Sequence, residues 1–309
     1  ASYVAQLDLP EGNAMRAPGE APGHMALEVA MDELAEKLGM DPVDLRLRND
    51  SDVVPGMPQK RFSGRHLARC LTEGAERFGW SRRNPKPGQV RDGQWLVGMG
   101  VAAGYRASPT LKSAARVGID GKGRVSVATD MTDIGTGSYT IIAQTAAECL
   151  GVDLKDVTVH LGDSAFPVSS GSGGQFGAAS STAGVYAACV NLRTEIARKL
   201  GLDPDKATFA DGYVREGNTS HRLTRAGALS ADGEISFGKF KQDYDVGTFA
   251  GHFCKVAVHA YTGEVRVRRM LAVCDAGRIL NPLSARSQVI GAMVMAAGAT
   301  LMEELAVDT

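Results

Sequence analysis

Residues 112–130, KSAARVGIDGKGRVSVATD, decide the fold class of this chain. Apolar and polar side chains alternate on both sides of Asp120-Gly121-Lys122-Gly123, and those four residues are typical of a tight turn. The pattern therefore predicts an antiparallel hairpin formed by residues 112–119 and 124–130.

Further elements are predicted on both sides of this hairpin. Strand patterns occupy residues 95–105, 157–161, 253–259 and 265–274, and the last two form a second hairpin. Helical patterns occupy residues 138–150 and 180–200, and Asn281-Pro282 begins a last helix that runs to about Leu305. Because the strands come mostly in hairpins with helices between them, we predict an α+β fold rather than a doubly wound parallel sheet.

The first part of the chain is predicted to be helical. Residues 25–38 carry a helical apolar stripe that ends at Gly39. Asp41 then serves as the N-cap of a short helix through Leu47, with Pro42 at its first position. A third helix is predicted over residues 63–78, and residues 80–93, rich in Pro, Gly, Arg and Lys, are predicted to be a linker.

Composition narrows the class of protein. The 309 residues are 44% hydrophobic and 22% charged with a formal net charge of -1, which indicates a globular chain and disfavours nucleic acid, a membrane surface or a polycation as partner. No stretch reaches the ~20 apolar residues of a membrane span. No export signal is recognisable, so the compartment, cytoplasmic or periplasmic, stays open.

Cysteine and histidine usage argues against a metal centre. The five cysteines form no CxxC pair and the six histidines are dispersed, so the thiols are interpreted as structural. Iron-sulfur or zinc ligation by this chain is not expected, because both need clustered ligands.

Two segments place glycines where the chain enters a helix. In residues 133–138, DIGTGS, the glycines would leave backbone N–H groups and the positive helix end free for an anion or a polar heterocycle. Residues 169–182, SSGSGGQFGAASST, form an unusual loop that a ligand with phosphate and many hydrogen-bonding edges would explain. The simpler interpretations are a glycine turn with a serine cap for the first segment and a flexible surface loop with a serine N-cap for the second. The second segment has neither the spacing nor the context of a Rossmann or P-loop motif.

A third segment, residues 15–23, reads MRAPGEAPG and precedes the first long helix. Its prolines and glycines would fix the backbone around Arg16 and aim one guanidinium at a ligand. A surface ion pair is an equally good explanation from this segment alone.

Together with residues 277–282, GRILNP, and 287–292, SQVIGA, these segments resemble, in order and spacing, the molybdenum-binding large subunit of the xanthine dehydrogenase/aldehyde oxidase family. Residues 15–48 resemble the family closely. The run GSGGQFGAASS and YAAC at 186–189 are most similar to bacterial aldehyde oxidoreductase and isoquinoline 1-oxidoreductase subunits. The resemblance covers nearly the whole chain, which is expected to be a fragment.

The resemblance implies a molybdopterin-binding domain of two lobes built from related repeats, incomplete at both ends. Residues 1–85 would be the C-terminal part of the first lobe, and residues 86–309 the second lobe without its C-terminal end. Molybdopterin, in the cytosine dinucleotide form, would hold molybdenum through its dithiolene sulfurs, with no protein metal ligand. The implied cofactor contacts are Gly135, Thr136, Gly137, Gly173, Gly174, Gln175, Phe176, Gly177, Ala178, Ser180, Ser181 and Gln288.

The implied reaction is hydroxylation of an aldehyde or an N-heterocycle, with water as oxygen source and electrons passed to iron-sulfur and FAD subunits. Arg16 would position the substrate. Pro18 stands where the animal enzymes have an aromatic residue, which disfavours a purine. The family's catalytic glutamate lies beyond the last motif found here, and neither Glu20 nor Glu303 and Glu304, placed on the polar side of the last helix, replaces it.

We therefore expect the chain alone to be inactive until the remaining segments of the molybdenum subunit join it. We also expect that the isolated chain can lack the cofactor. A non-catalytic remnant or scaffold module of the same fold is the alternative. The glycines at residues 135, 137 and 173–177 argue against it, since they cost stability unless a ligand uses them. A nicotinamide-dependent dehydrogenase lacks its strand-glycine-helix unit here.

Overall fold

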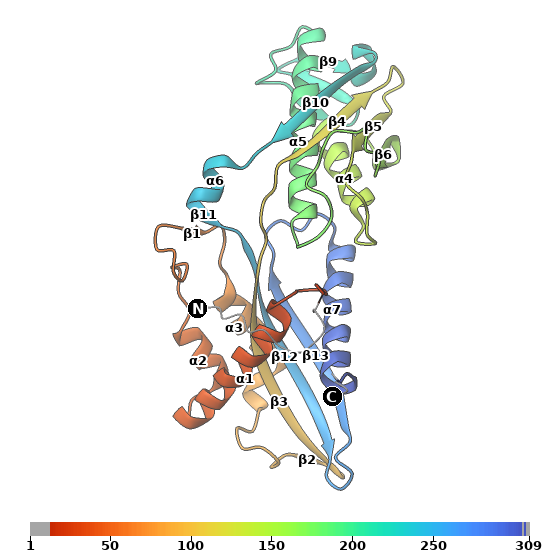
Figure 1. The fold of residues 1–309 in the computed structure, drawn as a ribbon. Helices are drawn as coiled ribbons and strands as arrows, with labels where there is room; N and C mark the ends of the chain where they lie inside the picture. Colours follow the sequence, from red (N-terminus) through yellow and green to blue (C-terminus); the bar gives the residue numbers. More distant parts are fainter. Residues whose placement is uncertain (1–12, 305, 307–309) are drawn as a thin grey trace.

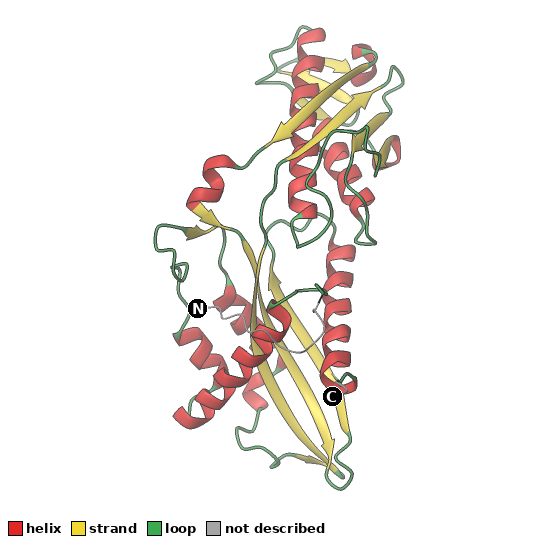
Figure 2. Ribbon diagram, viewed as in Figure 1, coloured by secondary structure: helices red, strands yellow, loops and turns green. Residues whose placement is uncertain are grey.

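The chain forms two lobes in the computed structural model, which describes residues 13–304 and 306 (Figure 1). The lower lobe contains residues 13–107 and 244–304, and the upper lobe contains residues 108–243. Each lobe combines helices with a largely antiparallel sheet (Figure 2). The predicted α+β class is confirmed.

Long strands form the sheet of the lower lobe. The strands β3 and β12 pair along their full length, from Ala107 opposite Gly247 to Trp95 opposite His259. The predicted second hairpin is confirmed as part of the longer pair β12–β13. The order is β13-β12-β3-β2, with bounds β2 (Arg91–Asp92), β3 (Trp95–Ala107), β12 (Gly247–His259) and β13 (Val265–Asp275).

The described residues of this lobe contain the α-helices α1 (Glu20–Leu38), α2 (Pro42–Arg48), α3 (Leu67–Phe78) and α7 (Pro282–Met302). The predicted end of α1 at Gly39, which has a φ of 62°, is confirmed, as is the cap of α2, where Asp41 accepts from the N–H of Val43 at 2.8 Å. The predicted cap of α7, Asn281, is confirmed as well. The helix α7 ends at Met302, so Glu303 and Glu304 follow the helix and do not lie on its polar side, while Leu305 lies outside the described residues.

Polar side chains attach α1 to the outer edge of β3. The Nε2 of His24 accepts from the N–H of Tyr105 at 3.2 Å, and Glu28 accepts from the N–H of Ala103 at 2.7 Å. Four residues of an α-helix advance about 6 Å and two residues of a strand about 6.6 Å, so residues four apart on α1 reach alternate N–H groups of β3. The predicted apolar stripe of this helix is mostly exposed, with Ala35 as its one buried member.

The beginning of the predicted linker belongs to the core of the lower lobe. Trp80 begins the short 3-10 helix η1 (Trp80–Arg82), is buried beside Phe253 and donates from its indole nitrogen to Asp41 at 3.0 Å. The prediction of a linker from residue 80 onward is wrong there, because the aromatic side chain is drawn into the core. The helices before residue 85 pack on strands after it. The boundary between residues 85 and 86 stays a prediction.

The upper lobe contains the first predicted hairpin, which is confirmed as β4–β5. The strand β6 pairs with β5 in parallel, and α4 forms the crossover between them. The sheet order is β10-β4-β5-β6, with bounds β4 (Ser113–Ile119), β5 (Val125–Thr129), α4 (Ser138–Leu150), η2 (Leu154–Asp156), β6 (Val157–Leu161) and β10 (Leu229–Ile235).

The long helix α5 (Gly177–Lys199) lies directly on this sheet because two glycines allow it. A Cβ on Gly233 of β10 would be 2.1 Å from the backbone nitrogen of Ala188, and a Cβ on Gly184 would be 2.8 Å from the Oγ of Ser113. The helix begins three residues before the predicted Ser180 and ends at Lys199 rather than Leu200.

Sequence patterns gave no prediction for most of the region between α5 and β12. It contains a small sheet, β7 (Thr208–Ala210), β8 (Tyr213–Glu216) and β9 (Thr219–Arg222), then η3 (Leu223–Ala226), β10 and α6 (Gly238–Asp243). The strand β11 (Tyr244–Asp245) pairs in parallel with β1 (Arg61–Phe62) at the junction between the lobes.

The five cysteines differ in burial. Cys70 and Cys189 are buried, Cys149 and Cys254 are half-buried, and Cys274 is exposed. Over the described part of the chain, no group of three or more possible ligands could hold a metal ion. No helix in the described residues has the length and apolar character to cross a membrane.

Candidate functional site

The loop before α4 is organised by one carboxylate, that of Asp133. Its Oδ1 accepts from the N–H groups of Gly135 at 2.8 Å, Thr136 at 3.0 Å and Gly137 at 3.3 Å. The glycine N–H groups are therefore not free, contrary to the physical reason for which this loop was singled out. The N-cap position is Gly137, not Ser138, which is buried as the first residue of the helix.

The backbone N–H groups of this loop stabilise the charged form of the Asp133 carboxyl. Burial alone would raise the pKa of this carboxyl, but the backbone N–H groups of Gly135, Tyr139, Gly137 and Ser138 outweigh it and lower the pKa below 3.8. A carboxyl whose pKa is lower in the folded state contributes stability that is present above its unfolded pKa and is lost as pH falls through its folded pKa.

We expect Asp133→Asn to remove this pH-dependent contribution. The difference in the free energy of unfolding between the native chain and the variant should be constant above about pH 5 and should shrink as the pH falls below about 4. Urea unfolding at a series of pH values measures it. Asp163→Asn is the control, because Asp163 accepts from a single loop N–H, that of Ala165. A difference that stays constant down to acid unfolding would contradict the assignment.

The second loop, residues 169–176, turns sharply into α5. Gly171 and Gly174 have φ of 74° and 44°, and Gln175 also has a positive φ of 65°. The helix N-cap is Phe176, so the serine N-cap of the simpler interpretation is not found. The Gln175 side chain donates to the Oγ1 of Thr248 at 2.6 Å, and its backbone oxygen accepts from Ser108 at 2.9 Å. This one residue therefore joins both chain segments that connect the lobes.

The structure brings the two glycine loops together. The Oγ of Ser172 donates to the backbone oxygen of Thr132, and a Cβ on Gly177 would be 3.2 Å from the methyl carbon of Met131. The helices that follow the loops, α4 and α5, pack side by side. Their positive N-terminal ends thus lie at one place, on the side of the upper lobe that faces the lower lobe (Figure 1).

The helix α7 reaches this junction from the lower lobe. Ser284 lies within 3.7 Å of the Cβ position of Gly137. Asn281 and Arg278, from the predicted GRILNP motif, bind Gln144 and Glu148 of α4 at 3.4 Å and 2.6 Å. This motif therefore fixes the start of α7 against the upper lobe.

Arg16 and Gln288, far apart in sequence, are also brought together. An Nη of Arg16 donates to the backbone oxygen of Gln288 at 2.9 Å and to its side-chain Oε1 at 3.1 Å. Arg16 forms this contact rather than the ion pair considered from sequence. Glu20 is paired with Arg106 at 2.8 Å. The segment is shorter than predicted, since α1 already begins at Glu20.

The residues predicted to contact the cofactor differ in exposure. Gly174, Gln175 and Ala178 are exposed, and Gly173 and Phe176 are half-buried. Ser180 and Ser181 are buried and their hydroxyls are engaged: Ser180 accepts from the N–H of Leu111 at 3.0 Å, and Ser181 donates to the backbone oxygen of Gly177 at 2.6 Å. The cofactor-binding role of all these residues stays a prediction.

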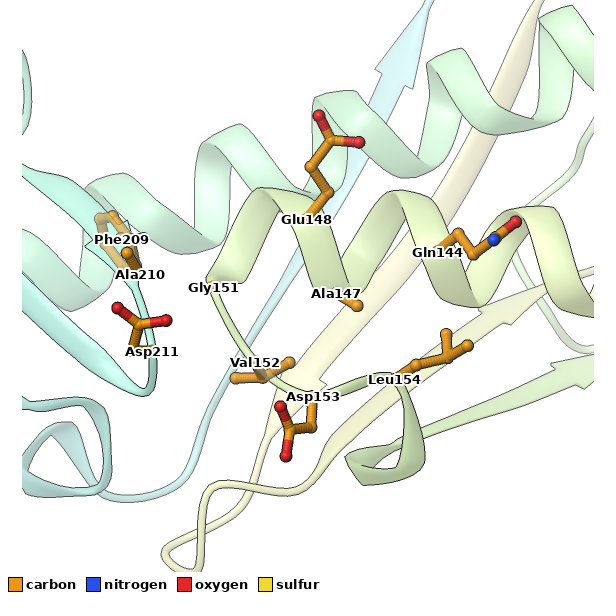
Figure 3. Close-up of a pocket in the computed structure, with 10 residues that line it drawn as sticks. All are labelled: Gln144, Ala147, Glu148, Gly151, Val152, Asp153, Leu154, Phe209, Ala210 and Asp211. Atoms are coloured by element: carbon orange, nitrogen blue, oxygen red, sulfur yellow. The ribbon is translucent and has the colours of Figure 1, made fainter. Parts of the chain in front are cut away.

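Two surface cavities lie away from this junction. One, of about 540 Å³, is beside α4, and its lining includes Glu148, Asp153 and Asp211 (Figure 3). The other, of about 670 Å³, is lined by residues that include Lys112, Asn191 and Glu234. Neither is lined by a predicted site residue.

Sequence reasoning missed Asp133 and the bridging role of Gln175. A signal existed for Asp133, because an aspartate two residues before a glycine commonly accepts from the backbone of its own turn. Thr248 and Ser108, the partners of Gln175, had no local signal, since their roles depend on contacts between segments distant in sequence.

Comparison with known protein families identifies the fold. A family model described as a molybdopterin cofactor-binding domain matches residues 73–309, and a second model with the same description matches residues 1–50. The chain belongs to this family. The predicted resemblance to molybdenum-binding large subunits is confirmed.

Relatives of this molybdopterin cofactor-binding domain include two Escherichia coli K12 subunits. The aldehyde oxidoreductase molybdenum-binding subunit PaoC is 64% identical over 308 residues, which is 99% of this chain and 42% of the relative. The putative xanthine dehydrogenase molybdenum-binding subunit XdhA is 30% identical over 337 residues, covering 99% of this chain and 44% of the relative. The chain thus spans less than half the length of these relatives.

Solved structures agree with the family. The crystal structure of quinoline 2-oxidoreductase from Pseudomonas putida 86 superposes with a TM-score of 0.76 at 25% identity, over 93% of this chain and 41% of that one. The aldehyde oxidoreductase of Desulfovibrio gigas, at 23% identity, has a TM-score of 0.74 over 93% of this chain and 32% of its own, and supports the fold alone.

Proposed function

We propose that this chain is part of the molybdenum-binding subunit of an oxidoreductase that hydroxylates aldehydes or N-heterocycles, with water as the source of oxygen. One observation carries the proposal: in a chain of the molybdopterin cofactor-binding family, both glycine loops and the start of α7 lie together at the junction of the lobes, with the Arg16–Gln288 pair four residues further along α7. The 64% identity to PaoC across nearly the whole chain favours an aldehyde as substrate.

The residues at the junction fit a large polar cofactor in part. The helices α4 and α5 direct their positive ends to it, and Gly171, Gly173 and Gly174 leave backbone there without side chains. The N–H groups of residues 135–137 already bind Asp133. The exposed residues Thr136, Gly174, Gln175 and Ala178, and the half-buried backbone of Gly173, are therefore better placed than those N–H groups to bind the cofactor.

Gln288 and Arg16 would act beside the cofactor. Gln288 would bind the pterin, and Arg16, whose guanidinium Gln288 orients, would place a polar substrate atom for reaction. Gly135, Gly137, Phe176 and Gly177 would shape the site, while buried Ser180 and Ser181 would hold the start of α5 in place. When bound, molybdopterin with molybdenum supplies the two-electron redox chemistry.

The cytosine dinucleotide form of the cofactor and the iron-sulfur and FAD subunits as electron acceptors belong to the same proposal. The cytosine dinucleotide form and these two partners follow from the family resemblance, and the description of PaoC as a molybdenum-binding subunit supports partner subunits in general. A complete hydroxylase would also need a general base. Glu20 lies near Arg16 in the sequence, but it is already paired with Arg106 and is therefore a poor candidate for this base.

Metal and pterin content test this proposal. The chain is purified with its genomic neighbours, molybdenum is measured by elemental analysis, and released pterin by fluorescence. We expect both in the assembled complex, together with oxidation of an aromatic aldehyde by a dye acceptor. Gly177→Val should lower both contents several-fold, because a side chain there meets Met131 and the backbone of Gly171.

Gly121→Val is the matched control, since a Cβ at this hairpin glycine meets no atom within 4 Å. It should load molybdenum and pterin as the native chain does. A correctly folded complex with neither molybdenum nor pterin would refute the proposal and favour a non-catalytic scaffold.

A further inference from the structure

The helix α7 presents one continuous apolar stripe to open space. Leu283, Ile290, Val294 and Leu301 are spaced by 7, 4 and 7 residues, which places them on one side of an α-helix. Their exposed fractions are 82%, 40%, 66% and 41%, and no residue of this helix is buried. A helix of 21 residues therefore leaves its apolar side without a partner in the described part of the chain.

This stripe is distinct from the side of α7 that faces the candidate site. Ser284 and Gln288, which reach Gly137 and Arg16, lie roughly 100–140° around the helix from the stripe, at about 100° per residue. One side of α7 thus serves the junction of the lobes, and another side is available for binding.

A second, shorter stripe lies on α1. Leu27, Leu34 and Leu38 are spaced by 7 and 4 residues, and their exposed fractions are 56%, 43% and 57%. This helix uses its polar residues for the contact with β3, so its leucines contribute little to the packing of the described chain. Two helices with unpartnered apolar sides in one chain point to an extensive buried interface.

A membrane surface is a poor occupant for α7. Helices that lie in a membrane interface usually carry several Lys or Arg residues on their polar side, whereas α7 carries Arg286 alone. A polypeptide with its own apolar face fits the stripe better, because it would cover the aliphatic side chains without a need for charge.

We infer that the stripe of α7, with the leucines of α1, binds the part of the molybdenum-binding subunit that this chain does not span. The inference rests on the proposed function for the identity of its occupant. The chain matches PaoC at 64% identity over 99% of its own length but over 42% of the relative, so more than half of that subunit is available to cover these surfaces.

Binding without cofactor tests the inference. The tagged chain is co-expressed with the portion of PaoC from Escherichia coli K12 that it does not match, and the complex is isolated by affinity and size-exclusion chromatography. We expect a one-to-one complex. The variant Val294→Asp should weaken it at least tenfold, because it places a carboxylate in the stripe.

The matched control is Val190→Asp, which introduces the same charge at an exposed position of α5 in the upper lobe. It should bind as the native chain does, and circular dichroism should show both variants folded. Equal binding by Val294→Asp and Val190→Asp would overturn the inference. So would the absence of a complex, or a homodimer dissociated by Val294→Asp, which would make a second copy the occupant.

These outcomes separate the inference from the proposed function. A complex that depends on Val294 but contains no molybdenum or pterin under loading conditions would support the docking surface and refute the hydroxylase. If the chain binds molybdenum and pterin but its Val294→Asp variant assembles normally, the hydroxylase is supported and the docking surface is refuted.

Discussion

Arg46→Ala should destabilise the lower lobe by about 3–5 kcal/mol, because it breaks a buried ion pair and leaves one partner behind. The Arg46 side chain is 3% exposed, and its Nε donates to Glu28 at 2.8 Å. Another nitrogen donates to Asp32 at 2.9 Å, and a third to the backbone oxygen of Pro42 at 2.8 Å. This one side chain joins α1 to α2.

The size of this loss of stability depends on the carboxylate of Glu28, which remains after Arg46 is removed. Glu28 also accepts from the N–H of Ala103, so without Arg46 a largely buried negative charge is left with little compensation at the contact between α1 and β3. The double variant Arg46→Ala/Glu28→Gln should recover part of the loss, since the remaining group is then neutral.

Urea unfolding followed by tryptophan fluorescence measures this loss, because both tryptophans, Trp80 and Trp95, belong to the lower lobe. Arg69→Ala is the control: it removes an exposed arginine paired with Glu73 on the surface of α3, and it should leave the transition almost unchanged. Equal effects of Arg46→Ala and Arg69→Ala would contradict the role assigned to the buried pair.

Gly233→Ala should destabilise the upper lobe by about 3 kcal/mol, at the high end for an over-packed core. The added methyl group would be 2.1 Å from the nitrogen and 2.4 Å from the Cα of Ala188, which are backbone atoms of α5 and cannot rotate away. The helix would have to move off β10, and its first residue, Gly177, belongs to the candidate site.

Far-UV circular dichroism should detect this loss, and tryptophan fluorescence should change little because both tryptophans are in the lower lobe. Gly100→Ala in β3 is the matched control. No atom lies within 4 Å of its Cβ position, so the change should be neutral or stabilise by about 0.4–1 kcal/mol through the unfolded chain. A Gly233→Ala protein as stable as the Gly100→Ala protein would show that α5 tolerates displacement.

Local patterns predicted the elements whose boundaries have local causes. The helix α4 and the strand β6 have the predicted bounds, and α2 and α7 begin at the predicted caps Asp41 and Asn281. A capping side chain or a turn glycine acts within a few residues, so its effect can be recognised in sequence.

The remaining features depend on contacts between distant segments. The polar attachment of α1 to β3 requires His24 and Glu28 to meet N–H groups that only the complete sheet places at its edge. The short strands β7, β8 and β9 have three or four residues each, too few for a clear alternation. At the candidate site, the glycine segments could be recognised, but the partners of Gln175, Thr248 and Ser108, lie more than 60 residues away in the sequence.

The insertion of the upper lobe between β3 and β12 determines the order in which the chain can mature on the ribosome. The strand β3 emerges long before its partner, and its pairing with β12, from Trp95 to Ala107, must wait until the whole upper lobe has been synthesised. During that interval the upper lobe, whose strands pair with one another, can fold first. The sheet of the lower lobe is completed afterwards, so β12 and β13, translated last, finish the sheet that β2 and β3 began.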